Sequence, residues 1–170
     1  MSHSGSIRRT PSLRAVVLAA LLALGLSGGV FAQSIPSIES EETPLHWAAG
    51  NGLTDIAARL IDNGALVSAP DHFGRTPLHR AVRSASMVEL LIDAGAAVNA
   101  SDVFGRTPLH EALPYPDTVR LLLDAGADVT AKDFMGHTPL DRSLRYGTGS
   151  RNRTVITLLL EAGAGAPPNR

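Results

Sequence analysis

The chain has 170 residues, of which 44% are hydrophobic, 18% charged and 4% aromatic, and it contains no cysteine. This apolar content is too high for a disordered protein, and the lack of cysteine excludes a disulfide scaffold, a thiol nucleophile and a thiolate zinc site. Beyond residue 32, twelve Lys and Arg stand against sixteen Asp and Glu. That part is mildly acidic, so we expect no nucleic-acid partner, which would require a basic face.

Residues 1–32 have the pattern of a cleavable signal peptide. Three arginines precede an apolar stretch over residues 15–26. As a helix, this stretch spans about 18 Å, which is shorter than the ~30 Å hydrocarbon core of a bilayer. Small side chains follow it, and we predict cleavage between Ala32 and Gln33. An uncleaved membrane anchor is the alternative interpretation.

Cleavage at that site predicts an exported protein with no membrane association after processing. We expect a bacterial periplasm first and the extracellular space second. The general secretory route is favoured over twin-arginine export, because Pro11 and Ser12 stand where the latter signal has bulky apolar residues. Residues 33–42 contain three glutamates and no apolar period, so we predict a flexible tether there.

The rest of the chain repeats itself. A Thr-Pro-Leu-His motif recurs, with Asp replacing His in the last copy, in steps of 33, 31 and 31 residues. The copies begin at Thr43, Thr76, Thr107 and Thr138. A Gly-Ala pair follows each copy, and an Asp-x-x-Gly motif precedes the last three. Several motifs that recur together at a fixed period are the signature of a repeat architecture.

Each unit has the start and stop signals of two short helices. The Thr hydroxyl can cap a helix whose first residue is the Pro, as in the predicted helix 44–49. A second helix ends at a glycine in the left-handed conformation, and the Asp-x-x-Gly motif then forms a tight projecting turn. Spacing of i, i+3, i+4 predicts the buried side chains of the second helices. These are Ala57, Leu60 and Ile61; Val88, Leu91 and Ile92; Val119, Leu122 and Leu123; and Ile156, Leu159 and Leu160.

On these motifs the chain resembles the ankyrin repeat family over residues 43–166. The resemblance implies an all-α fold, an α-solenoid of stacked helix-turn-helix repeats with projecting β-hairpin loops. We place the repeats, a loop and the tail as follows: repeat 1 at 43–75, repeat 2 at 76–106, repeat 3 at 107–137, repeat 4 at 138–166 with an enlarged, basic and flexible inter-helix loop at 145–153, and a tail at 167–170.

Three histidines, His46, His79 and His110, occupy the same place in successive repeats. Packed helices lie ~8–10 Å apart, so these side chains cannot share one metal ion at bonds of about 2 Å. We predict that each hydrogen-bonds its own Thr or the backbone and ties adjacent repeats together, as the resemblance also implies. Asp141 takes the fourth place, where we expect a looser connection. No catalytic constellation stands out, so we expect no enzyme, no cofactor and no metal.

In the family that this chain resembles, partners bind the hairpin tips and the exposed side of the first helices. The corresponding tip residues are His72, Phe73, Arg75, Val103, Phe104, Arg106, Phe134, Met135 and His137. The corresponding first-helix residues are Trp47, Arg80, Glu111 and Arg142. Aromatic and arginine side chains contribute a large share of interface energy.

Several of these residues have an alternative structural role. Phe73 and Phe104 would instead pack inward, the arginines would pair only with the turn aspartates, and Trp47 would fill the weakly apolar first repeat. The loop 145–153 is interpreted as a solvated insert rather than a contact for an acidic partner.

The sequence therefore predicts a non-enzymatic protein-binding module that recognises another protein with a preformed rigid surface. We expect an adaptor or protector of a resident periplasmic protein. A secreted effector that binds a target outside the cell is the alternative, and a small hydrolase is a remote one. The identity of the partner and the oligomeric state are left open.

Overall fold

The computed structural model describes residues 42–146 and 149–165. The predicted signal peptide with its cleavage site between Ala32 and Gln33, the tether up to residue 41 and the tail 167–170 lie outside the described residues. Within them the chain forms helices and turns without a β-strand.

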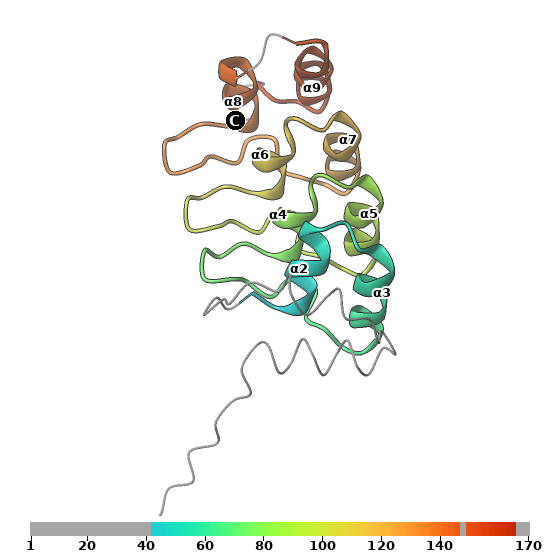
Figure 1. Cartoon of the computed structure of the whole chain (residues 1–170). Helices are drawn as coiled ribbons and strands as arrows, with labels where there is room; N and C mark the ends of the chain where they lie inside the picture. The colour runs from blue at the N-terminus through green and yellow to red at the C-terminus, as the bar shows by residue number, and fades with distance from the viewer. Residues whose placement is uncertain (1–41, 147–148, 166–170) are drawn as a thin grey trace, which may run out of the picture.

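The described residues form four helix pairs stacked in one direction (Figure 1). The first helices of the pairs are α2 (Pro44–Gly50), α4 (Pro77–Ala81), α6 (Pro108–Ala112) and α8 (Pro139–Tyr146). The second helices are α3 (Thr54–Asp62), α5 (Ala85–Asp93), α7 (Pro116–Asp124) and α9 (Ser150–Glu161). First helices line one side of the stack and second helices the other, and three loops project from the side of the first helices. The predicted α-solenoid is confirmed.

The helix boundaries follow the predicted signals. Thr43, Thr76 and Thr107 are extended N-cap residues, and the Pro after each is the first helical residue. Each second helix is followed by a glycine with φ between 83° and 93°, at Gly64, Gly95, Gly126 and Gly163. Only glycine adopts this conformation without strain, so it ends the helix at that point.

Apolar side chains that recur at the same place in each repeat build one continuous core. The second-helix residues Val88, Leu91, Val119, Leu122 and Leu159 are fully buried, and so are the first-helix leucines Leu45, Leu78 and Leu109. Burial of each such side chain contributes about 1.5–3 kcal/mol. Because every repeat packs only against its neighbours, this core runs along the stack in one dimension.

The predicted burial holds only in part for Ile61, Ile92 and Leu123, which are half-buried against the core, and it is wrong at the end of the stack. Leu160 is 52% exposed and Ile156 is only half-buried, whereas Val155 is buried in their helix. The spacing rule assumes a neighbour on both sides of α9, and among the described residues no further helix pair follows it. The side of α9 that faces away from α7 is therefore open to solvent.

The three histidines connect the repeats as predicted. In each, Nδ1 lies 2.9–3.0 Å from the Thr hydroxyl that caps its own helix. Nε2 lies 2.8 Å from the carbonyl oxygen of Arg75 for His46, and 3.0 Å from that of Arg106 for His79. His110 makes the equivalent contact to the carbonyl oxygen of His137 at 3.2 Å. One imidazole thus joins a helix cap to the next projecting loop, and we call this series the histidine ladder.

The ladder ends in the fourth repeat. There the Asp141 carboxylate accepts hydrogen bonds from the Thr138 backbone N–H at 2.9 Å and from its hydroxyl at 2.8 Å. An ionised carboxylate has no proton to donate to a carbonyl oxygen. Asp141 therefore caps its own helix without forming a link beyond it.

The projecting loops form a second ladder. In each loop the Asp carboxylate accepts backbone hydrogen bonds that close a tight turn, as Asp71 does from Phe73 and Arg75 at 2.8 and 2.9 Å. The loops then join one another, because the Phe73 carbonyl accepts from Val103 N–H at 2.8 Å. The Phe104 carbonyl accepts in the same way from Phe134 N–H at 2.9 Å. We call residues 71–75, 102–106 and 133–137 the fingers.

The enlarged loop predicted at 145–153 is wrong in its extent. Both flanking helices extend into it, since α8 continues to Tyr146 and α9 begins at Ser150. No proline interrupts this stretch, unlike the turn between α6 and α7, where Pro116 is the first residue of α7. The Ser143 hydroxyl donates to Asn152 Oδ1 at 2.7 Å, which joins the two lengthened helices.

The histidine ladder predicts that acid weakens the fold. Burial lowers the pKa of His46, His79 and His110 below the ordinary value of 6.5, although the carbonyl contact of each raises it in part. A lowered folded-state pKa means that protons bind preferentially to the unfolded chain below about pH 6.5. We expect the free energy of unfolding, from urea titrations followed by circular dichroism, to fall as the pH drops from 7.5 to 5.

A His79→Gln variant serves as the control for this prediction. It should lose about 1–3 kcal/mol at pH 7.5, because buried hydrogen-bond partners are left unsatisfied. Its stability should also depend less on pH than that of the wild type. A wild-type stability that stays constant from pH 7.5 to 5 would contradict the neutral ladder.

The close contact between fingers predicts a difference between two glycines with left-handed φ. A Cβ at Gly105 (φ 74°) would lie 2.9 Å from Phe134 Cδ1 and 3.1 Å from its backbone N, whereas one at Gly95 (φ 83°) would meet nothing within 4 Å. Gly95→Ala should cost about 1 kcal/mol through backbone strain alone. Gly105→Ala should cost about 1–3 kcal/mol more, because the next finger must shift. Equal losses in thermal unfolding would refute the finger contact.

Candidate protein-binding surface

The finger tips carry a row of exposed apolar side chains. Phe73 is 39% exposed, Phe104 50%, and Phe134 and Met135 79% and 78%. Val103 is also exposed, so the row continues from finger to finger. Exposure is greatest on the last finger, which no further finger covers among the described residues. We call Phe73, Val103, Phe104, Phe134 and Met135 the fingertip row.

The first two rings of this row are held by arginines. The Arg75 guanidinium lies 4.8 Å from the centroid of the Phe73 ring, and that of Arg106 lies 4.9 Å from the Phe104 ring. The His72 ring lies beside Phe73, with 3.7 Å between the centroids. These cation–π and ring contacts fix the orientation of rings that are still partly open to solvent. The structure therefore places Phe73 and Phe104 at the surface and not in the core.

The same arginines pair with the turn aspartates. Arg75 Nη2 lies 2.9 Å from Asp71 Oδ2, and Arg106 Nη2 lies 2.8 Å from Asp102 Oδ2. Arg106 also pairs with Glu111 at 2.8 Å. Each arginine thus pairs with its turn aspartate, as one of the two alternatives predicted, and also lies over a partly exposed ring.

The turn aspartates are ionised anchors of the fingers. Burial alone would raise the pKa of Asp71 and Asp102, but hydrogen bonds from the Arg75 and Arg106 backbones and side chains outweigh it. Their pKa values are therefore lowered below the ordinary 3.8. At neutral pH each finger is closed by a charged carboxylate that accepts bonds from its own backbone.

The third finger is held differently. His137 stands where the other fingers have Arg, and its Nδ1 lies 3.7 Å from Asp133 Oδ1. The Asp133 carboxylate instead pairs with Arg142 Nη1 from α8 at 3.4 Å. No arginine lies over Phe134 in the contacts that the structure describes. Phe134 and Met135 are accordingly the most exposed part of the fingertip row.

The predicted first-helix residues lie beside the fingers, and three of the four are paired. Arg80 Nη2 lies 2.6 Å from Glu42 Oε1, while Glu111 and Arg142 pair with finger residues. Trp47 is half-buried and lines an open groove of about 340 Å³. Its other lining residues are His46, Gly50, Asn51, Arg80 and Arg83. The groove adjoins the surface that the sequence predicted for the partner.

Two features of this surface were missed by the sequence analysis. Glu42 was assigned to a flexible tether, yet it is buried and pairs with Arg80. Glu42 directly precedes Thr43, in the same position that Arg75 and Arg106 have in later repeats. This equivalence was the signal available in the sequence. Arg83 was given no role by the sequence, and its Nε donates to the Tyr115 hydroxyl of the next repeat at 3.0 Å. No spacing rule predicts that contact.

The described ranges hold neither a metal-binding cluster nor a membrane-spanning helix. They contain no group of three His, Cys, Asp or Glu side chains arranged to hold a metal ion. None of their helices has the length and apolar character needed to cross a bilayer.

Comparison with known proteins gives the same repeat pattern. A family model described as ankyrin repeats (3 copies) matches residues 18–102, 45–133 and 84–170. A putative ankyrin repeat protein of Rickettsia bellii is 52% identical over 44 residues, which is 26% of this chain and 18% of that protein. Human neurogenic locus notch homolog protein 4 is 46% identical over 57 residues, 34% of this chain and 3% of its own length.

A third relative, ankyrin repeat domain-containing protein 37 of Bos taurus, is 40% identical over 52 residues. That stretch is 31% of this chain and 33% of the relative. Each of these similarities spans a third or less of the relative, so it concerns the repeats and not the whole of the other protein. The family model covers most of the chain, and the stacked helix pairs are consistent with it: this chain belongs to the ankyrin repeat family.

Proposed function

We propose that the protein is an exported adaptor or protector that binds a resident periplasmic protein through its fingertip row and first-helix surface. Ankyrin repeats mediate binding to another protein, and this is the general function that family membership supports. The exposure of the fingertip row is the observation that supports this choice of surface. Its five apolar side chains are exposed on a rigid, hydrogen-bonded ladder.

The rigidity of the fingers favours binding. Each finger is closed by an aspartate and bonded to its neighbour, so little conformational entropy remains to be lost on association. A contiguous exposed apolar surface is unfavourable for a monomer in water and marks an interaction site. Binding would cover Phe134 and Met135 almost completely, because these two are about four-fifths exposed in the free chain.

The charges of this surface favour a partner that contributes apolar contacts. Arg75, Arg80 and Arg106 already have carboxylate partners within the chain. A partner carboxylate would have to compete with these pairs, while apolar groups can pack on the exposed rings without breaking them. The arginines therefore orient the surface rather than supply its main attraction.

The histidines support a binding role over an enzymatic one. His46, His79 and His110 are buried, and each holds a Thr hydroxyl on one nitrogen and a carbonyl oxygen on the other. A general base needs a ring nitrogen within reach of a substrate proton. These imidazoles have both nitrogens occupied by the fold.

Replacing two rings of the fingertip row tests the proposed surface. In a Phe73→Ser, Phe104→Ser variant we expect capture of the partner to fall about tenfold or more, because aromatic anchors contribute most to interfaces. The measurement is crosslinking and pull-down from the exported fraction. Melting temperature and helical circular dichroism should stay near wild type, since both rings are exposed.

The matched control is Leu66→Ser, which removes a leucine that is 76% exposed outside the fingertip row. It should capture the partner as the wild type does. Loss of folding in the double variant would assign the two rings to the core. Unchanged capture would rule out the fingertip row as the docking surface.

The export proposal predicts a defined processed form. The purified protein should begin at Gln33, as read by mass spectrometry, and an Ala32→Arg variant should stay unprocessed because a large side chain does not fit the peptidase pocket. Cell fractionation should place the processed chain in the periplasm. Accumulation in the medium without lysis would favour the secreted effector instead, and an intact chain in the membrane fraction would favour an anchor.

A further inference from the structure

Each end of the stack presents a repeat face of the kind that is buried wherever two repeats pack together. Inside the stack α3 packs on α5, α5 on α7 and α7 on α9, and the first helices follow one another in the same way. Each junction joins the C-terminal side of one repeat to the N-terminal side of the next. The first repeat presents an N-terminal side, and the fourth a C-terminal side, that no helix of the described ranges covers.

The C-terminal end exposes apolar side chains to a greater extent than the internal repeats expose their equivalents. Leu144 is 62% exposed and Leu160 52%. Leu140 is half-buried, although its equivalents Leu45, Leu78 and Leu109 have no exposure. Ile156 is also half-buried, and its equivalents Ala57, Val88 and Val119 have none. This end is therefore an apolar stacking face, which we call the tail face (Leu140, Leu144, Ile156, Leu160).

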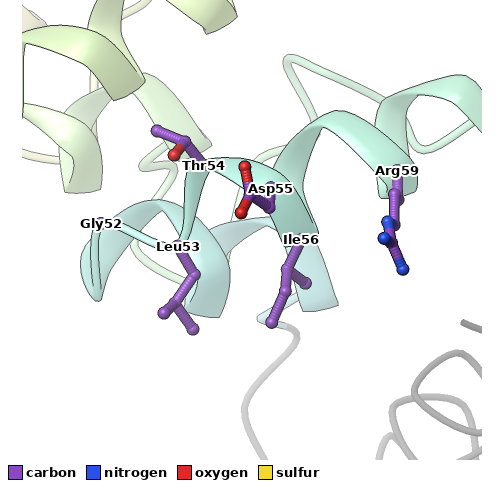
Figure 2. Close-up of a pocket in the computed structure, with 6 residues that line it drawn as sticks. All are labelled: Gly52, Leu53, Thr54, Asp55, Ile56 and Arg59. Atoms are coloured by element: carbon purple, nitrogen blue, oxygen red, sulfur yellow. The ribbon is translucent and has the colours of Figure 1, made fainter. Parts of the chain in front are cut away.

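The N-terminal end has a matching hollow. Leu53 and Ile56 are both half-buried and point off α3 to the same side (Figure 2). With Gly52, Thr54, Asp55 and Arg59 they line an open groove of about 350 Å³. The residues equivalent to Ile56 in the later repeats are Met87, Thr118 and Val155, and all three are buried at junctions. We call Leu53 and Ile56 with this groove the head face.

The charges of the two end repeats are opposite. In residues 42–75 four acidic side chains stand against two arginines, and in residues 138–164 four arginines stand against two acidic side chains. Opposite net charge favours the approach of a head face to a tail face. Like charge disfavours head against head and tail against tail.

We propose that the protein associates head to tail with a second copy of itself, the tail face of one molecule packing on the head face of the next. The contact repeats the internal junction between molecules, with side chains at positions that the internal junctions bury wholly or in part. Because the two faces differ, a pair of molecules still has one free head face and one free tail face. The association is therefore open-ended. The fingers are outside this contact, so the fingertip row would continue from one copy to the next.

Sedimentation velocity over a range of concentrations tests the proposal on the protein purified as the cell processes it. The average mass should rise with concentration and not level off at a dimer. Raising the salt from about 0.05 to about 0.5 M should weaken the association, because it screens the attraction between the end repeats. A monomer at every concentration would overturn the proposal.

Two single substitutions separate the faces. Ile56→Gln alters the head face and Leu160→Gln the tail face, each with an uncharged side chain that leaves the charge pattern intact. Each variant alone should associate at least about tenfold more weakly, because an amide would be buried without a partner. Glu89→Gln, which places the same side chain on α5 in the middle of the stack, is the control and should associate like the wild type.

Mixing the two variants gives the decisive result. One retains an intact tail face and the other an intact head face, so the mixture should form a one-to-one dimer that grows no further. If the mixture stays monomeric, or if either variant alone still forms a stable dimer, the head-to-tail contact is wrong. Circular dichroism and melting check the fold of each variant, and Leu53→Gln replaces Ile56→Gln if the latter lowers the melting temperature.

Discussion

The structure depends on a neutral imidazole between two repeats. His46, His79 and His110 each accept on Nδ1 from a helix cap and donate from Nε2 to the carbonyl before the next repeat. Each hydrogen bond contributes only about 0.5–1.5 kcal/mol net. The ring is buried, however, so any other register would leave its nitrogens, the Thr hydroxyl and the carbonyl without partners. The ladder therefore fixes how far each repeat is displaced from the last.

That fixed displacement determines the geometry of the fingers. The carbonyls that the histidines bind belong to Arg75, Arg106 and His137, the last residues of the three fingers. With its base held there, a finger is closed by its aspartate and meets the next finger through one backbone hydrogen bond. The buried imidazoles thus set the spacing of the exposed rings at the finger tips. The proposed binding surface is thus built without any tip residue contributing to the core.

The sequence predicted most of the fold because the same signals for helix starts and helix ends recur in every repeat. Thr-Pro marks a helix start, a Gly-Ala pair marks a helix end, and the histidines recur at one place, so the stacked helices and the ladder followed directly. The errors lie where periodicity stops. Leu160 was expected in the core because the spacing rule cannot show that no helix pair of the described residues packs beyond α9. Residues 145–153 were expected as a loop because length alone does not distinguish a loop from two longer helices.

The candidate surface was predictable in position but not in its chemistry. The repeat register located the tip residues, yet sequence spacing left two roles open for Phe73 and Phe104. The structure places both rings at the surface, where an arginine held by an aspartate lies over each ring and the side chain stays partly exposed. Arg83 and Tyr115 came together through the stacking of two repeats, a contact 32 residues apart that no local motif encodes.

Because contacts run only between neighbouring repeats, the core does not limit the length of the stack. The length of the stack depends on its two ends, that is, on whether another repeat covers the apolar face there. Substitutions at the fingertips alter neither the ladder nor the core, and substitutions at the ends alter neither the ladder nor the tips. As proposed, recognition of a partner and extension of the stack are therefore separable, because they rest on different residues of one repeated unit.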